Sequence, residues 1–226
     1  MEKCGFLLIN KPAGLTSHDV IDELRKITGI KKIGHSGILD PLATGLLVVG
    51  VGRKATKKLS DFLKMDKEYV AKIRLGAVSE TLDKQGPIKE VEVKKIPSQE
   101  EVREFLNKFI GDIEQVPPIY SAKHFKGKRL YQLARQGIKV TPEPIKVKVY
   151  YLNLLDYSWP YLKIKTKVSS GTYLRSLARD IGDALGCKGY LENLVRTKVG
   201  SFDLEQAVDL NKLNSSNWEN FLKKVN

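Results

Sequence analysis

The chain has 226 residues and a mass of 25.4 kDa; 42% of its residues are hydrophobic, 29% are charged, and its formal net charge is +13. It contains no run of about 18 apolar residues and no apolar core of a signal peptide near its start, which argues against a membrane span and a secreted protein. Two distant cysteines without Cys or His neighbours, Cys4 and Cys187, argue against a zinc site and a disulfide framework.

The first third of the chain predicts two strands and two helices, followed by a third strand. The first helix begins at Thr16, because Asp19 three residues later completes a capping-box pattern, and it ends at Gly29. Residues 68–75 alternate between apolar and polar side chains, which predicts the third strand. The remaining bounds are 5–10 and 46–51 for the first two strands and 54–63 for the second helix.

The rest of the chain continues this mixture. Ser98 and Glu101 form a second capping-box pattern, which opens a helix. We expect a polar loop at 77–87, an extended segment at 115–122, helices at 129–136, 172–185 and 217–225, and strands at 145–155, 161–169 and 195–202. Strands and helices interleave without a regular βαβ rhythm, so the predicted fold class is α+β with a mixed, largely antiparallel sheet.

Residues 34–45 are the most informative segment, because they place Asp40, His35 and two hydroxyl groups among three glycines and a proline. Gly permits unusual backbone angles, and Pro41 biases Asp40 away from the helical region. A buried strand follows at once, so Asp40 is expected on a rigid loop anchored to the core, where catalytic side chains are often placed. Taken alone, an aspartate before a proline is more often a turn former.

Positive charge is concentrated in parts of the chain. Residues 121–151 contain eight basic residues and one acidic residue. Clustered charge and a pI near 9.6 favour an anionic partner, most simply nucleic acid. A lysine-rich surface kept for solubility or heat tolerance is the alternative.

The segment 34–45, Gly-His-Ser-Gly-Ile-Leu-Asp-Pro-Leu-Ala-Thr-Gly, resembles the signature loop of the TruB family of tRNA pseudouridine synthases. Three further segments resemble that family in the same order along the chain: Asn10–Ser17, Lys67–Tyr69 and Ser169–Ser176. Ser36 and Ile38 replace threonines that are common in bacterial members, and residues 77–83 follow the family only loosely, so no role is assigned there. The resemblance implies a pseudouridine-synthase-like fold, with helices and loops around a central RNA-binding cleft.

The resemblance also implies roles for individual residues. Asp40 would initiate glycosidic cleavage, either as a nucleophile on the sugar or as a base at the neighbouring ribose position. Arg175 would pair with Asp40, and Tyr69 would stack on the base and receive the carbon-5 proton. Tyr173 and Leu194 would line the pocket, although both could equally be core residues. For Tyr69, a core position on its strand would be favoured without the flanking motif. The remaining implied roles are extrusion of the target uridine by His35 and RNA contacts by Lys123, Lys126, Lys128 and Arg129.

The reaction needs no metal or cofactor, and the sequence has no GxxxxGK[ST] or GxGxxG motif and no metal-ligand spacing among its three histidines. The expected function is conversion of the T-loop uridine at position 55 of tRNA to pseudouridine by a monomeric, cytoplasmic isomerase. The alternatives are a related synthase acting on another RNA and an RNA chaperone that refolds tRNA without turnover. Residues 1–226 would form one catalytic domain, with two lobes and without the PUA-type domain of many relatives.

Overall fold

The computed structural model describes residues 3–125, 127–138 and 140–225. The chain divides into two compact units, and both chain ends belong to the first, which comprises Met1–Tyr69 and Leu194–Asn226; the second is Val70–Asn193. Two strands, β4 (Lys67–Leu75) and β12 (Gly189–Val199), have residues in both units. Within the described ranges, no helix has the length and apolar character needed to cross a membrane.

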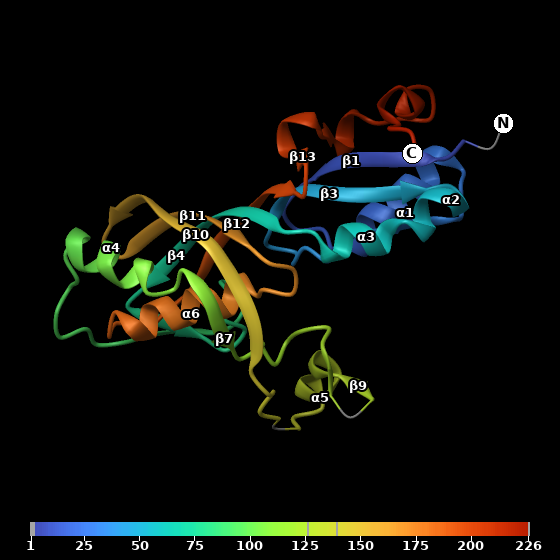
Figure 1. Cartoon of the computed structure of the whole chain (residues 1–226). Helices are drawn as coiled ribbons and strands as arrows, with labels where there is room; N and C mark the ends of the chain where they lie inside the picture. The colour runs from blue at the N-terminus through green and yellow to red at the C-terminus, as the bar shows by residue number, and fades with distance from the viewer. Residues whose placement is uncertain (1–2, 126, 139, 226) are drawn as a thin grey trace. The chain divides into compact units, whose positions relative to one another are not determined.

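The first unit contains a small mixed sheet with the strand order β14-β1-β3-β12 (Figure 1). Strand β1 is antiparallel to β3 and parallel to β14, and β3 is parallel to β12, where Arg196 lies opposite Gly45. Short strand β2 also pairs with β3, and β13 pairs with β12. The bounds are β1 (Gly5–Lys11), α1 (Ser17–Thr28), β2 (Ile33–His35), β3 (Thr44–Val51), α2 (Gly52–Lys57), α3 (Leu59–Lys64), β13 (Phe202–Asp203) and β14 (Val208–Asp209), with 3₁₀ turns at Leu204–Gln206, Leu210–Lys212 and Trp218–Phe221.

Strands β1 and β3 are covered on both faces, which explains why both are almost continuously apolar. On one face, Leu7 and Ile9 pack with α1 and with Trp218 from the end of the chain. On the other face, Phe6 and Leu8 pack with residues of α2 and α3. This double burial gives the loop between β2 and β3 a rigid base.

The second unit is built on the strand order β12-β4-β11-β10-β7, and α4 and α6 lie on one side of these strands (Figure 1). Two small hairpins, β5-β6 and β8-β9, stand outside this sheet. The bounds are β5 (Ala77–Ser79), β6 (Ile88–Glu90), α4 (Gln99–Asn107), β7 (Gly111–Gln115), β8 (His124–Phe125), β9 (Lys128–Arg129), α5 (Leu130–Arg135), β10 (Ile145–Ser158), β11 (Tyr161–Val168) and α6 (Leu174–Ala184).

Most predicted elements are confirmed, including the two capping boxes, at Thr16 and Ser98. The second predicted helix is divided at Lys58 into α2 and α3. The predicted helix at 217–225 is wrong, because only the 3₁₀ turn Trp218–Phe221 forms there. The side chains of Asn214 and Asn217 accept hydrogen bonds from nearby backbone N–H groups, and such local bonds compete with a regular helix.

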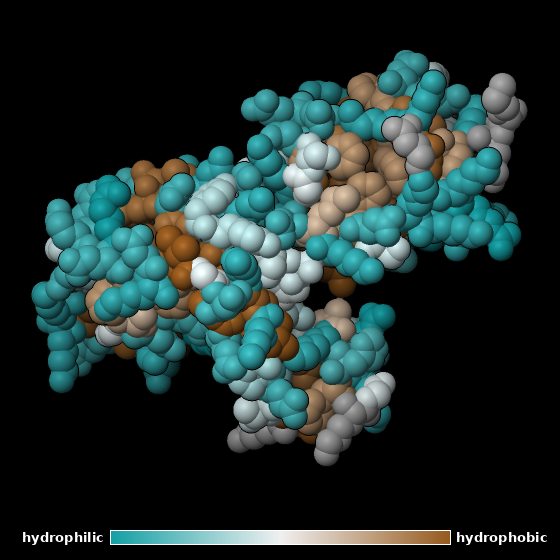
Figure 2. Space-filling view, viewed as in Figure 1, coloured by the Kyte–Doolittle hydropathy of each residue, from teal (hydrophilic) through white to brown (hydrophobic). Residues whose placement is uncertain are grey.

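Figure 2 shows that hydrophilic residues dominate the visible surface and that hydrophobic residues reach it in limited patches. One exposed apolar side chain belongs to the informative loop, since Ile38 is 59% exposed. Its neighbours Leu39 and Leu42 are buried, at 2% and 4% exposure. The loop therefore alternates between residues that anchor it and residues that face outward.

Candidate active site

Asp40 lies on a short turn whose flanking side chains are buried. Its carbonyl oxygen accepts a hydrogen bond from the backbone N–H of Ala43 over 3.0 Å, which closes a turn with Pro41 at the second position. Asp40 itself is half-buried, between the buried side chains of Leu39 and Leu42. The turn prediction for the sequence Asp-Pro is therefore confirmed, and it coexists with a side chain held at the edge of the core.

Three hydrogen bonds attach this loop to distant segments of the first unit. The backbone N–H of Leu39 donates to Ser17 Oγ over 2.9 Å, and that of Gly14 donates to the carbonyl of Pro41 over 2.8 Å. The N–H of Ser36 donates to the carbonyl of Val48 over 2.9 Å. The bonded residues of the loop lie on both sides of Asp40, and two of them, Leu39 and Pro41, are its direct neighbours. The bonds therefore restrict the backbone that carries the Asp40 carboxylate.

A buried lysine lies within electrostatic reach of Asp40. The side chain of Lys11 is fully buried, and its Nζ donates to the carbonyls of Pro12 and Leu15 over 2.8 and 2.7 Å. Burial lowers the pKa of Lys11 to about 8, and the negative charge of Asp40 opposes that shift. Sequence reasoning gave Lys11 no role, although it belongs to the segment Asn10–Ser17 that resembles the family.

His35 and Arg196 are two further ionisable side chains at the loop. Arg196 is buried, and its guanidinium donates to the carbonyls of Leu46 and Gly37. Burial lowers the pKa of His35 below its ordinary value, and the charge of Arg196 adds to that shift. A depressed pKa keeps the imidazole neutral at neutral pH, as expected for a side chain that contacts RNA without transferring a proton.

Tyr69 and Leu194 are buried on β4 and β12, at 8% and 5% exposure. Tyr69 shares the buried face of its strand with Ala71 and Ile73, and the residues between them are less buried. Such positions suit both a core residue and the wall of a narrow pocket. The assignment of Tyr69 and Leu194 to the substrate pocket therefore stays a prediction.

In the second unit, Arg175 sits in the first turn of α6 and is 7% exposed. Its Nη1 donates to the carbonyl of Thr81 over 3.1 Å, and its Nη2 donates to the carbonyl of Tyr120 over 3.0 Å. The same Nη1 lies 3.7 Å from Oδ2 of Asp83, a buried carboxylate. Arg175 is therefore a buried residue of α6, and its predicted pairing with Asp40 stays a prediction.

Asp83 is a residue that sequence reasoning missed. Its Oδ1 accepts hydrogen bonds from Thr81 Oγ1 over 2.6 Å and from the backbone N–H of Gln85 over 3.0 Å. Between them, Leu82 has a positive φ of 61°, a conformation that is costly for a branched side chain. No local sequence signal marked Asp83, because its partner Arg175 is remote in the sequence.

Tyr173 caps the N-terminus of α6, and its backbone N–H donates to Oε1 of the buried Gln115 over 2.8 Å. Tyr173, Arg175 and Asp83 therefore belong to one framework within the second unit. Asp40, His35, Lys11 and Arg196 form a corresponding framework within the first. In these frameworks the buried cations Lys11, Arg196 and Arg175 are each held by hydrogen bonds to backbone carbonyl groups.

Comparison with known proteins assigns the chain to a family. Residues 25–174 match the family model "TruB family pseudouridylate synthase (N terminal domain)", and residues 175–225 match "tRNA pseudouridylate synthase B C-terminal domain". This chain belongs to the TruB family. The match covers the Asp40 loop and the Arg175 helix, so the resemblance inferred from four short segments extends over most of the sequence.

Individual TruB relatives agree with this assignment. The chain is 48% identical to tRNA pseudouridine synthase B of Protochlamydia amoebophila over 205 residues, 91% of this chain and 78% of the relative. It is 47% identical over 216 residues to the protein of the same name from Caldanaerobacter subterraneus, covering 95% and 75%. A solved Cbf5-Nop10-Gar1 complex contains a chain with a TM-score of 0.72 and 30% identity, covering 92% of this chain but 52% of that one. The predicted fold is thereby confirmed.

The basic segment of this TruB-family chain forms a hairpin followed by a short helix. His124 pairs with Arg129 and Phe125 with Lys128, and α5 begins at the next residue. Lys128 and Arg129 are exposed, whereas Lys123 is half-buried and its Nζ lies 3.4 Å from the carbonyl of Glu143. Lys126 lies outside the described residues. The RNA-binding role of this segment stays a prediction.

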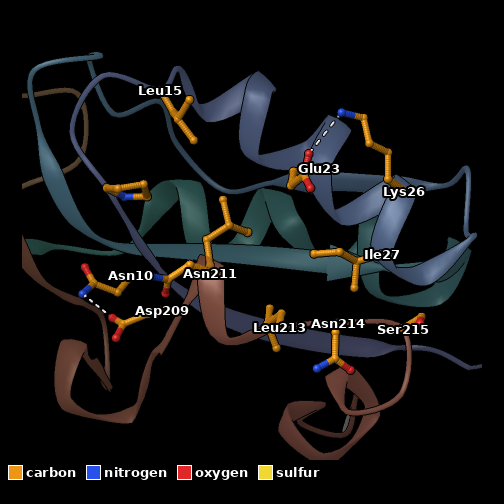
Figure 3. A pocket seen from close by; sticks show the side chains of 12 residues that line it. Asn10, Leu15, Glu23, Lys26, Ile27, Asp209, Asn211, Leu213, Asn214 and Ser215 are labelled. Carbon is orange, nitrogen blue, oxygen red and sulfur yellow. Dashed lines mark hydrogen bonds and ion pairs between the residues drawn. The ribbon is translucent and has the colours of Figure 1, made fainter.

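The first unit also contains a pocket of about 780 Å³ that is lined by residues other than the predicted site residues (Figure 3). It lies between α1 and the 3₁₀ turn after β14, with Leu15, Ile27 and Leu213 among its apolar walls. Two polar pairs line it, Asn10 with Asp209 and Glu23 with Lys26 (Figure 3). None of the described residues that line this pocket is one of the catalytic, pocket-lining or RNA-contacting residues predicted from the resemblance. In the described ranges, no group of three His, Cys, Asp or Glu side chains could hold a metal ion.

Proposed function

We propose that this chain converts the T-loop uridine at position 55 of tRNA to pseudouridine, with Asp40 as the catalytic carboxylate. The observation that carries the proposal is the Asp40 loop itself, a TruB-type sequence fixed by three hydrogen bonds, to Gly14, Ser17 and Val48. The names of the relatives, tRNA pseudouridine synthase B, support tRNA as the substrate. The proposed enzyme acts as a monomer in the cytoplasm, and residues 1–226 serve as its catalytic domain.

The proposed reaction conserves every atom. The bond between ribose carbon 1′ and base nitrogen 1 breaks, the uracil turns over, and carbon 1′ joins carbon 5 of the base. Carbon 5 then loses its proton, while nitrogen 1 ends with one. Asp40 starts the sequence as a nucleophile on the sugar or as a base at the neighbouring ribose position, and Tyr69 receives the carbon-5 proton.

Charged groups around the proposed site assist this chemistry. Lys11 places a buried cation within electrostatic reach of Asp40, which favours the ionised carboxylate. Arg175 is already held by two carbonyls and by Asp83, so its guanidinium is orientated before substrate binds. We propose that Tyr173 and Leu194 close the pocket around the freed base, which keeps water from the reacting carbon.

Access to the uridine requires that it leave the folded T-arm. Extruding a nucleotide costs a few kcal/mol, and phosphate contacts offset that cost through counterion release. We propose that His35 contacts the space left by the extruded uridine. Lys123, Lys126, Lys128 and Arg129 would contact the phosphates, because two of the described members, Lys128 and Arg129, are exposed beside each other on a hairpin.

The test is incubation with an unmodified T-arm transcript, a full tRNA transcript and an unrelated RNA hairpin, followed by mapping of pseudouridine. One modified T-loop position is expected with the parent chain and none with Asp40→Ala. Asp22→Ala, an exposed aspartate of α1 paired with Arg25, is the matched control and should keep full turnover. Modification of the unrelated hairpin instead would assign the chain to another RNA. Refolding of tRNA without formation of pseudouridine would instead support the alternative function, an RNA chaperone.

A further inference from the structure

Arg196 joins the two ends of the segment that carries Asp40. Its Nε donates to the carbonyl of Leu46 over 2.7 Å, and its Nη2 donates to the carbonyl of Gly37 over 3.3 Å. Gly37 precedes Asp40 and Leu46 follows it, so one guanidinium holds the entry and the exit of the loop. We propose that Arg196 is a positioning residue that fixes the Asp40 carboxylate for glycosidic cleavage, an inference that rests on the proposed function.

The backbone around Arg196 explains how its side chain reaches both carbonyls. Strand β12 runs parallel to β3, with Arg196 opposite Gly45. Gly45 has a φ of 102°, and a Cβ there would lie 2.4 Å from the carbonyl oxygen of Arg196. Only a glycine allows this close approach, which places the C-terminal part of β12 directly against the start of β3, where the loop ends. The arginine side chain then extends over the loop instead of into solvent.

The geometry of the donors explains why arginine is needed. The guanidinium is planar and holds its nitrogens in a fixed fork, whereas a lysine ammonium is a compact charge on a flexible stem. Two carbonyls separated along the loop can therefore be bonded at once by arginine in one orientation. A lysine at position 196 would keep the positive charge but would lose this simultaneous contact with Gly37 and Leu46.

The charge of Arg196 also acts on the loop. Arg196 is 1% exposed, so its positive charge is only weakly screened by water. The pKa values of Lys11 and His35 are both lowered, chiefly by burial and further by Arg196, which places its charge within reach of both residues. The guanidinium therefore combines a mechanical constraint with a positive potential beside Asp40.

The experiment measures single-turnover pseudouridine formation with a saturating T-arm transcript, alongside the Kd for that RNA, for Arg196→Lys and Arg196→Met. A small displacement of a catalytic group costs about 10- to 100-fold in rate, so Arg196→Lys is expected to lose at least about tenfold. Its Kd should stay within about twofold of the parent. Hydrogen exchange of the amides in residues 36–43 should accelerate, while that of β1 should not change.

Leu24→Ala is the control for a purely structural role, because Leu24 is fully buried in the core of the same unit, where it packs with residues of β1 and β3. It should lower the unfolding temperature and leave the rate of the folded protein unchanged. If Arg196→Lys does not fold, Arg196→Gln replaces it, since its amide keeps a donor for one carbonyl. A folded variant with the parental rate and unaltered exchange would overturn the inference. Absence of turnover in the parent would instead refute the proposed function.

Discussion

Nη1 of Arg175 lies 3.7 Å from Oδ2 of Asp83, and both side chains are buried in the second unit, at 7% and 3% exposure. Asp83 is held in place by Thr81 Oγ1 and by the N–H of Gln85. An arginine expected to face a catalytic carboxylate therefore has a second carboxylate within its own unit. Asp83 limits the orientations that Arg175 can adopt and offsets part of its buried charge.

Replacing Asp83 by Asn should weaken both stability and turnover. The change is nearly isosteric but leaves the buried guanidinium without this anionic partner, a loss of about 3–5 kcal/mol in unfolding free energy. Because Arg175 would then adopt other orientations, turnover on the T-arm should fall by about tenfold or more. Denaturant unfolding and single-turnover assays measure the two effects.

Asp156→Asn is the matched control, since Asp156 is an exposed aspartate of the same unit. It should change the unfolding free energy by less than about 0.5 kcal/mol. Equal behaviour of the two variants would show that the position of Asp83 has no special importance for Arg175.

The lowered pKa of buried Lys67 should make the free energy of unfolding increase with pH in the alkaline range. Its buried Nζ donates to the carbonyls of Phe62, Leu63 and Met65, and burial lowers its pKa to about 8. Between about pH 8 and 10.5, the unfolded chain holds a proton that the folded chain has released. Stability therefore rises with pH across that window, and Lys67→Met removes this contribution.

Urea unfolding of the parent and of Lys67→Met at several pH values tests this prediction. The free energy of unfolding of the parent minus that of the variant should increase from pH 8 to 10.5. Other groups that titrate there, such as Cys187, are common to both proteins and cancel in the difference. A difference that stays constant or decreases with pH would contradict the assigned pKa.

Gly45→Ala should lower the free energy of unfolding more than Gly29→Ala, its control. Gly45 and Gly29 both have positive φ, 102° and 70°, so alanine costs about 1–2 kcal/mol at either position. At Gly45 the new Cβ would also meet the backbone of Arg196, whereas at Gly29 nothing lies within 4 Å. That overlap should add about 1–3 kcal/mol. Thermal unfolding of the two variants compares them, and equal losses would show that the close approach is unimportant.

Neutralising Lys128 and Arg129 together should weaken T-arm binding in dilute salt more than in concentrated salt. Each lost phosphate contact lowers the slope of log affinity against log salt by about 0.7–0.9. Lys89→Gln with Lys94→Gln removes the same charge from exposed positions outside the hairpin and is the control. An unchanged slope in the Lys128 and Arg129 variant would exclude these side chains from phosphate contact.

Local signals in the sequence predicted local structure well. The helices opened by Thr16 and Ser98 follow from capping boxes that lie within four residues of sequence, and β4 follows from simple alternation. Strand β7 was missed, because Asp112 and Glu114 give it a polar pattern. It exists through pairing with β10, about thirty residues away, which no local window reveals.

The same distinction applies to the site. Asp40 could be proposed as the catalytic residue because its neighbours in the chain form a recognisable loop. Asp83 and Arg196 could not be proposed, because their importance depends on contacts with Arg175, Gly37 and Leu46, which are remote in sequence. Their residue types alone, an aspartate in a polar loop and an arginine in a strand, predict surface positions.

The bonds from Arg196 reach across 150 and 159 residues of chain. During translation, the ribosome releases the Asp40 loop long before it releases the arginine that holds it. The second unit is synthesised entirely in between. A nascent chain interrupted before Arg196 would therefore contain the proposed catalytic carboxylate without this guanidinium fork to hold it, so we expect activity only after Arg196 has been synthesised.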